Sequence, residues 1–569
     1  MMMDDRAARK DRYFILFIFL AAFLVRMIYI VQVLQFPLTE YLARSGTFDQ
    51  YGFDKAASFI ASGNWLGGEG VFGKEPLYSY FLASIYKIFG YSHFAVYIVQ
   101  SLLTSFGVVL LYKITSQVFN RASGYIASFI MAFYSISIFY DALLLRASLI
   151  TFLTILTLYL LLEARRKKGY LMWLFSGIAL GLSVLTRHNI LLPFIVFFIL
   201  VTIRPFKRAI KYAAVFIAGM FIVLLPVLAR NYVVSGTGKI GISSEINAFW
   251  VGNTYNSSGV DFEPSDPEYR DLEFGSRGSV GKTARLFFME INKRPARYLR
   301  LYARKAWMFF NGYEAPSNTN YYLYREEFPT VLRWPLFSFR LVCSLAILGI
   351  LLSVLRQKRP YLVLIFLGVL SGSVMVFHIQ SRFRLPAAPL FIIFCSYAAY
   401  FIFDRIKEGR LIRSLVIVAL AIFFYALLRP DLTYAGFRDK DDIIRHIDRT
   451  NLALAYIDGY KIYGDNEALK LALRQCDLAI EKEMFDYSPY AVKAHIYFLK
   501  DRYDDSIDEY KKALVYESRN PFLYNEIAGV YYNQGAYEKA LLYEKRALYL
   551  FPENKVFEKN LDMIPVSKR

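Results

Sequence analysis

The sequence predicts an all-α protein, in which a membrane domain of about eleven transmembrane helices precedes a C-terminal α-solenoid of helical repeats. Three observations lead to this fold class. The chain of 569 residues is 56% hydrophobic, a composition typical of polytopic membrane proteins. Apolar runs of bilayer length are separated by short basic clusters. The C-terminal part instead repeats a helical pattern every 34 residues. We therefore predict a membrane domain over residues 1–430 and a repeat domain over residues 440–569.

Eleven apolar segments are predicted to cross the membrane, at residues 13–35, 95–117, 122–139, 141–163, 170–187, 189–204, 211–229, 335–355, 360–378, 385–404 and 411–428. With the N-terminus in the cytoplasm, the basic clusters at 6–12, 165–168, 204–208, 356–359 and 404–413 all fall on the cytoplasmic side, as the positive-inside rule requires. The odd number of spans then predicts that two long loops, about 36–94 and 230–334, and the repeat domain are extracytoplasmic. We expect a multi-pass protein of the cell (inner) membrane whose active face is also extracytoplasmic.

The C-terminal region carries small and aromatic residues at the offsets of a two-helix repeat. Over residues 521–554 these are Tyr524, Ile527, Ala528, Tyr531, Gly535, Tyr537, Ala540, Ala547 and Pro552. This segment resembles a tetratricopeptide repeat, although Glu544 stands where an aromatic residue is usual. A second copy lies 34 residues earlier, and a weaker third begins near Ala453. Such arrays usually present a concave peptide-binding face, and a helical stalk without a ligand is the alternative.

The charge distribution indicates the kind of partner. The net charge is +20, yet residues 430–569 hold 21 basic and 24 acidic residues, against 46 and 23 in the remainder. A basic excess confined to the hydrophobic part indicates cytoplasmic loops and anionic headgroups, so we expect a membrane lipid partner and no nucleic acid. The cysteines Cys343, Cys395 and Cys476 form neither metal-ligand spacing nor a disulfide framework. We expect no metal and no cofactor.

The first external loop carries groups that suit a lipid phosphate. Asp49 precedes a run of apolar residues at helical spacing, and Lys74 and Glu75 stand directly before a proline that favours a helix start. We therefore predict two interfacial helices that hold an acid and a lysine at the depth of the headgroups. Asp49 is the candidate general base for an acceptor hydroxyl. The candidate ligands of the donor phosphate are Lys74, Arg382 and Arg384.

Structural roles are the alternatives for these residues. Asp49 would also suit a helix cap, and Lys74 would suit an interfacial anchor. Arg187 and Arg382 would also suit helix ends, from which arginine side chains extend toward water. Charged residues inside predicted spans are costly and should have buried partners, and two arginines are in this position: Arg26 and Arg146.

Seven segments, taken in order, extend this interpretation. They are "FDQYGFDKAA" (48–57), "KEPLYSYFLASIYKIFG" (74–90), "LTRHN" (185–189), "LPVLARNYVVSG" (225–236), "FWVGNTYNSSG" (249–259), "FFNGYEAPSNTNYYLYRE" (309–326) and "QSRFRLPAAPLF" (380–391). The ordered set resembles the multi-spanning glycosyltransferases of the C-type fold (GT-C), especially family-39 relatives. These relatives are the protein O-mannosyltransferases and the bacterial enzyme that transfers aminoarabinose to lipid A.

The resemblance implies an inverting transfer of a sugar from a polyprenyl-phosphate donor, which is a substrate and not a cofactor. It implies Asp49 as the base and further substrate contacts in the matched segments, at Glu75, Tyr78, Arg187, Arg230, Asn253, Tyr313 and Tyr321. The protein O-mannosyltransferases carry an acidic pair in the first loop, whereas Gln50 follows Asp49 here. The acceptor, a protein, a lipid or a glycan, therefore stays open.

Two other functions are compatible with the same residues. One is an oligosaccharide ligase or polymerase that uses a diphosphate-linked donor. The other is a non-catalytic membrane scaffold that recruits partners through its repeats. If the protein is a transferase, we expect the repeats to recruit a protein or glycan acceptor and to take no part in the chemistry.

Overall fold

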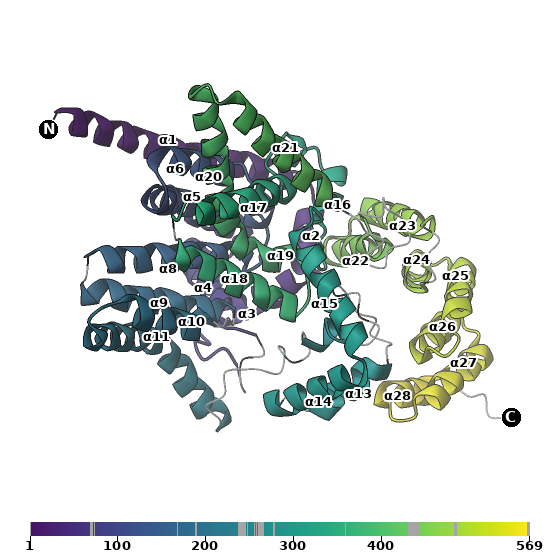
Figure 1. Cartoon of the computed structure of the whole chain (residues 1–569). Helices are drawn as coiled ribbons and strands as arrows, with labels where there is room; N and C mark the ends of the chain where they lie inside the picture. Colours follow the sequence, from purple (N-terminus) through teal and green to yellow (C-terminus); the bar gives the residue numbers. More distant parts are fainter. Residues whose placement is uncertain are drawn as a thin grey trace. The chain divides into compact units, whose positions relative to one another are not determined.

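The computed structural model describes residues 2–68, 72, 74–167, 169–187, 191–236, 246, 249–254, 257, 259, 267–276, 279–358, 360–430, 444–482 and 486–565 (Figure 1). Within these ranges the regular structure is helical, apart from one isolated parallel bridge between Tyr134 and Phe337. Contacts divide the chain into two compact units. The membrane unit comprises Met1–Gln35, Gly52–Ser317 and Tyr324–Asp442, and the repeat unit comprises Phe36–Tyr51, Asn318–Leu323 and Ile443–Arg569. The predicted all-α fold with a C-terminal repeat region is confirmed.

The membrane unit is built from apolar helices and shorter connecting helices. They are α1 (Met2–Val33), α4 (Leu77–Phe89), α5 (His93–Val118), α6 (Arg121–Ala132), α7 (Ser135–Asp141), α8 (Ala147–Lys167), α9 (Tyr170–Thr186), α10 (Leu191–Thr202), α11 (Phe206–Ser235), α13 (Pro267–Ser276), α14 (Val280–Lys293), α15 (Pro295–Phe310), η1 (Val331–Arg333), α17 (Phe339–Leu355), α18 (Tyr361–Val376), α19 (Ser381–Arg384), η2 (Leu385–Ala387), α20 (Ala388–Lys407) and α21 (Leu411–Leu427). Two further helices, α3 (Asp49–Ala61) and α16 (Tyr321–Glu327), have residues in both units.

Five helices in the described part of the chain are long and apolar enough to cross a membrane: Lys10–Val33, His93–Val118, Ala147–Lys167, Phe206–Ser235 and Ser381–Lys407. Five shorter apolar helices accompany them: Tyr170–Thr186, Pro193–Thr202, Phe339–Leu355, Tyr361–Val376 and Ser414–Leu427. The protein is therefore a multi-pass membrane protein. The exact number of eleven spans, and the sidedness that depends on an odd number, stay predictions.

The predicted span at 122–139 is interrupted in the structure. The α6 helix ends at Ala132 and α7 begins at Ser135. At the break, the amide of Ser135 donates to the carbonyl of Phe337 (3.1 Å), and the amide of Phe337 donates to the carbonyl of Phe133 (3.1 Å). In a continuous helix these backbone groups would bond within the helix, whereas here they bond to the backbone of Phe337. A hydropathy pattern does not reveal such a break.

Both arginines within the predicted spans have buried partners, as expected. Arg26 lies 2.7 Å from Asp141, and it also donates to the carbonyls of Ala22 and Ala132. The second oxygen of Asp141 accepts a hydrogen bond from Thr104 (2.8 Å). A buried ion pair is tolerated when its remaining polar atoms are satisfied, and this network meets that condition. Arg146 pairs with the buried carboxylate of Glu75.

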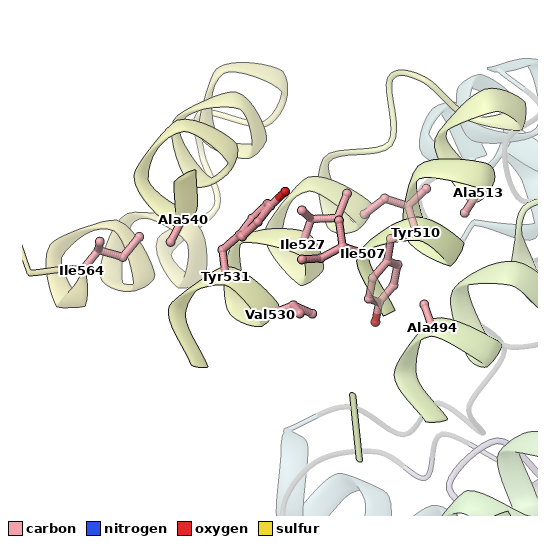
Figure 2. Close-up of a cluster of buried hydrophobic side chains, with 10 residues drawn as sticks. Ala494, Ile507, Tyr510, Ala513, Ile527, Val530, Tyr531, Ala540 and Ile564 are labelled. Carbon is pink, nitrogen blue, oxygen red and sulfur yellow. The ribbon is translucent and has the colours of Figure 1, made fainter. Parts of the chain in front are cut away.

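The repeat unit is a row of helix pairs: α22 (His446–Tyr463) with α23 (Asn466–Ile480), α24 (Ser488–Leu499) with α25 (Tyr503–Tyr516), and α26 (Pro521–Asn533) with α27 (Tyr537–Leu550). The α28 helix (Lys555–Met563) follows the last pair, and α2 (Leu38–Arg44) belongs to the same unit. Figure 2 shows the core, in which Ala494 and Ala540 stand among Ile507, Tyr510, Ile527 and Tyr531. Small residues at the helix crossings leave room for these larger side chains.

Candidate active site

Two cations lie near the ring of Phe53, a residue of the α3 helix that belongs to the membrane unit. The ammonium of Lys74 lies 5.1 Å from the ring centroid, and the guanidinium of Arg146 lies 5.8 Å from it. Arg146 forms an ion pair with the buried carboxylate of Glu75 and also donates to the carbonyl of Thr186 (3.3 Å). Cations over an aromatic face are stabilised by the ring quadrupole. Lys74 itself is exposed, so its charge is accessible from solution.

A second pair of cations meets on the ring of Phe383. The guanidinium of Arg187 lies 3.6 Å from the ring centroid, and that of Arg382 lies 4.9 Å from it. Arg187 directly follows Thr186, whose carbonyl receives the hydrogen bond from Arg146. The structure therefore brings three of the predicted site residues, Lys74, Arg187 and Arg382, into one region of the membrane unit. The cationic cluster is defined here as Lys74, Arg146, Arg187 and Arg382.

A small pocket, open to the surface, adjoins this cluster. Its walls come from α8, from α18 and from the segment 383–386, and Arg187 and Phe383 are among its lining residues. The other lining side chains are mostly apolar, namely Ile150, Thr154, Leu370, Ser373, Val374 and Pro386. The pocket thus combines an apolar wall, made by apolar helices, with a cationic group and an aromatic ring.

Arg384 is placed differently from Arg382. It is buried, and its guanidinium donates to the carbonyls of Phe309 (3.0 Å), Asn311 (2.9 Å) and Tyr313 (2.8 Å) and forms an ion pair with Glu314 (2.7 Å). Burial raises the pKa of Glu314 above its usual value, and the Arg384 guanidinium opposes that rise. These contacts join the segment 309–314 to the segment that carries Arg382. Tyr313, whose carbonyl accepts from Arg384, is also buried. Arg384 and Tyr313 therefore both make structural contacts within the protein.

Three further predicted residues also make structural contacts. The guanidinium of Arg230 donates to the carbonyls of Leu66 and Gly68 (2.7 Å each) and lies 3.9 Å from the ring of Phe72, which holds the loop before Lys74. Tyr78 is fully buried and donates to Gln100 (2.8 Å). The third residue, Asn253, belongs to a buried polar network.

Asn253 is the hub of that network, and it reveals a lysine that sequence reasoning did not single out. The Asn253 amide donates to the carbonyls of Phe249 (2.7 Å) and Val376 (2.9 Å), and its oxygen accepts from Tyr302 (2.8 Å) and Lys305 (2.9 Å). Lys305 is fully buried, and burial lowers its pKa to about 7. It also donates to the carbonyl of Phe377 (2.7 Å), which precedes the segment of Arg382. The apolar residues at helical spacing on either side of Lys305 in α15 are the sequence signal that could indicate its burial.

The candidate base Asp49 is the first residue of α3, is half-buried and belongs to the repeat unit. Tyr321 is buried and belongs to the same unit. The nearby acid Asp54 is engaged elsewhere: it accepts hydrogen bonds from Tyr86 (2.6 Å) and Tyr91 (2.8 Å) and lies 3.2 Å from His93. Burial acts in the opposite direction, but these bonds together hold the pKa of Asp54 below its usual value. A weakly basic, buried carboxylate is poorly suited to accept a proton from a substrate.

Several predicted features lie partly outside the described residues. They include the "LTRHN" segment at 188–189, the "FWVGNTYNSSG" segment at 255, 256 and 258, and the basic clusters at 168 and 359. Within the described ranges, no group of three or more His, Cys, Asp or Glu side chains could hold a metal ion. The absence of a metal requirement stays a prediction.

Residues 73–229 match the family described as dolichyl-phosphate-mannose-protein mannosyltransferase, and residues 494–535 match the TPR repeat. Comparison with curated proteins gives no match. The family match supports the predicted resemblance to the glycosyltransferases over residues 73–229, and the second match confirms the tetratricopeptide repeat region.

Among solved structures, the chain is similar to the archaeal oligosaccharyltransferase AglB from Archaeoglobus fulgidus in complex with an inhibitory peptide and a dolichol-phosphate. The identity is 16%, the TM-score is 0.42, and the match covers 73% of this chain and 55% of that one. It is also similar to ArnT from Cupriavidus metallidurans bound to undecaprenyl phosphate, with 13% identity, a TM-score of 0.38, and coverage of 81% and 74%. The chain thus spans about half the length of the archaeal enzyme. Both likenesses are weak.

Proposed function

We propose that the protein transfers a sugar, with inversion, from a polyprenyl-phosphate donor to an extracytoplasmic acceptor at the cell membrane. The observation that carries this proposal is the junction of the cationic cluster with the apolar pocket. A prenyl phosphate has an anionic head on a long apolar chain, and Arg187 and Phe383 line a pocket that offers contacts for both. The description of the matched family also includes a dolichyl-phosphate-linked sugar, a donor of this class.

In the proposed reaction, Asp49 removes the proton from the acceptor hydroxyl as its oxygen attacks the anomeric carbon. The new carbon–oxygen bond forms while the bond to the phosphate oxygen breaks, and the prenyl phosphate leaves with the electron pair. The departing phosphate needs charge stabilisation, and Lys74, Arg187 and Arg382 supply it. Arg146 pairs with Glu75 and holds this part of the loop. Arg384, the other arginine predicted to bind phosphate, is buried and holds the segment that carries Arg382.

The acceptor class stays a protein, a lipid or a glycan. Gln50 occupies the position where the protein O-mannosyltransferases carry a second acid, which weakens protein mannosylation in particular. The structural contacts give no preference for a monophosphate over a diphosphate donor, since both present the same anionic oxygens to arginine and lysine.

The experiment compares Asp49→Asn with Lys74→Ala. Asp49→Asn keeps the size of the side chain but removes the base, so the transfer rate should fall by about 10²–10⁴ while donor binding survives. Lys74→Ala removes a charge that faces the phosphate before and during the reaction, so donor affinity and rate should fall together. Donor binding and transfer are measured in nanodiscs with a prenyl-phosphate sugar.

Lys87→Ala is the matched control, because Lys87 is an exposed lysine on the neighbouring α4 helix. It should leave both donor affinity and rate unchanged. Transfer by Asp49→Asn within a few-fold of the wild-type rate would place the base elsewhere. Equal donor affinity in Lys74→Ala and Lys87→Ala would remove Lys74 from the phosphate site.

A further inference from the structure

The first external segment of the chain folds with the repeats and not with the helix that precedes it. Residues Phe36–Tyr51 belong to the repeat unit, and their helix α2 packs on α22, the first helix of the array (Figure 1). The face of α2 that includes Leu38, Tyr41 and Leu42 is buried. The α2 helix therefore acts as an additional helix of the repeat array, although about 400 residues of sequence separate the two segments.

Tyr41 anchors α2 through a contact that only a glycine permits. A methyl group added to Gly459 on α22 would lie 2.5 Å from the Tyr41 ring, a distance at which the ring must move. The Tyr41 hydroxyl donates to Asp465 Oδ2 (2.8 Å), and the other oxygen of Asp465 caps α23 by accepting from the amide of Glu467 (3.0 Å). The rings of Tyr456 and Tyr463 lie 6.3 and 5.7 Å from the Tyr41 ring.

A short, hydrogen-bonded turn connects this anchor to Asp49. The carbonyl of Tyr41 accepts from the amide of Ser45 (2.8 Å), and the carbonyl of Ser45 accepts from the amide of Phe48 (3.1 Å). Ser45 and Phe48 are both buried. Asp49 follows immediately as the first residue of α3. The backbone between the anchor and Asp49 is thus ordered by bonds within the repeat unit, so a shift of Tyr41 is transmitted to Asp49.

The second external loop is held by the same unit. Residues Asn318–Leu323 belong to the repeat unit, and the Asn320 amide donates to Asp448 Oδ2 (2.6 Å). Asp448 lies in the first turn of α22 and also forms an ion pair with Arg445 (2.7 Å). Two of the residues predicted for the active site, Asp49 and Tyr321, are therefore ordered by the repeats.

We propose that the repeat unit is a working part of the transferase, in which Tyr41 is a positioning residue that sets the place of Asp49. This inference rests on the proposed function, since it assigns Asp49 as the base. It replaces the expectation that the repeats only recruit an acceptor.

The test compares Gly459→Ala with Gly529→Ala in the full-length protein. Gly459→Ala adds a methyl group against Tyr41, whereas Gly529, in the corresponding helix α26 of another repeat, has nothing within 4 Å of an added methyl group. Displacements of about 1 Å can cost on the order of 10²-fold in rate. We expect Gly459→Ala to lower kcat at least tenfold with small and large acceptors alike, with donor affinity unchanged. Gly529→Ala should match the wild type.

Hydrogen exchange over residues 36–51 supplies a readout that does not depend on activity. Exchange should quicken in Gly459→Ala and stay at the wild-type rate in Gly529→Ala. Tyr41→Phe removes only the hydrogen bond from the hydroxyl to Asp465 and should give a smaller increase in exchange. If Gly459→Ala does not fold, Tyr41→Phe is the variant that tests the anchoring.

The outcomes separate this inference from the function on which it rests. Unchanged exchange over 36–51 in Gly459→Ala and Tyr41→Phe would overturn the anchoring itself. Quicker exchange with an unchanged kcat would overturn the positioning of Asp49. A wild-type protein that transfers no sugar from any prenyl-linked donor would refute the proposed function, while the exchange result would still decide whether the repeats hold α2.

Discussion

Glu544 is a buried carboxylate at a position of the last repeat where an aromatic side chain is usual. Glu544 is 1% exposed, and Tyr510 occupies the equivalent position in the preceding repeat. Burial, together with the charge of Glu526, raises the pKa of Glu544 to about 7. The neutral carboxyl is therefore the form that the folded repeats favour.

The stability of the last repeats should consequently fall as the pH rises. Because the pKa of Glu544 is higher in the folded state, its contribution is fully present below the unfolded value of 4.5 and is lost as the pH passes about 7. We expect the C-terminal helices to resist unfolding better at pH 5.5 than at pH 8, by on the order of 2 kcal/mol. Proteolysis of α26–α28 in urea, with the full-length protein, measures this difference.

Glu544→Gln should abolish most of that pH dependence, since a neutral amide does not titrate. The matched control is Glu553→Gln, which changes an exposed glutamate in the loop before α28. An equal pH dependence in the two variants would show that another group is responsible.

The α9 and α11 helices approach so closely that a glycine of each helix faces the backbone of the other. A methyl group added to Gly177 would lie 1.9 Å from the carbonyl oxygen of Phe216, and one added to Gly219 would lie 2.2 Å from that of Leu174. Small residues at such crossings allow membrane helices to approach closely. The contact atoms belong to the backbone, so they cannot rotate away from an added methyl group.

Gly177→Ala should therefore destabilise the membrane unit by about 1–3 kcal/mol, because α9 and α11 must separate. The measurement is the melting temperature in nanodiscs. Gly368→Ala on α18 is the control, since nothing lies within 4 Å of a methyl group there. The same melting temperature for both variants would contradict the close packing of α9 on α11.

The orientation of the whole protein in the membrane is a further prediction. The basic clusters and an odd number of spans place the repeat unit outside the cytoplasm. The native cysteines Cys343, Cys395 and Cys476 are buried, so the native chain provides an unlabelled background for added cysteines. Lys512→Cys places a thiol on an exposed surface of α25, and Lys358→Cys places one in an exposed segment predicted to be cytoplasmic.

A membrane-impermeant maleimide should label Lys512→Cys in intact spheroplasts and should label Lys358→Cys only after lysis. The reverse pattern would invert the orientation of the whole protein and would place the proposed active face in the cytoplasm. Labelling of both thiols in intact spheroplasts would mean that the number of spans between them is even.

The residues of the candidate site stay predictions. Lys74 and Arg382 are indicated by their predicted place at the depth of a lipid phosphate, and Arg187 is indicated by the family resemblance. The structure places these three residues in one region. The separation of Arg382 from Arg384 could not be predicted, since it depends on the carbonyls that the fold brings to Arg384. For the same reason the burial of Lys305 was missed.

Sequence alone was sufficient for the apolar helices and for the 34-residue repeat, because helix periodicity and bilayer length are local properties of the chain. The resemblance to the glycosyltransferases also depends on sequence alone, through an ordered set of segments. The membership of residues 36–51 in the repeat unit required the three-dimensional arrangement. One of the contacts involved is that of Gly459 with the ring of Tyr41, and a contact between residues so far apart in the chain leaves no periodic signal in either segment.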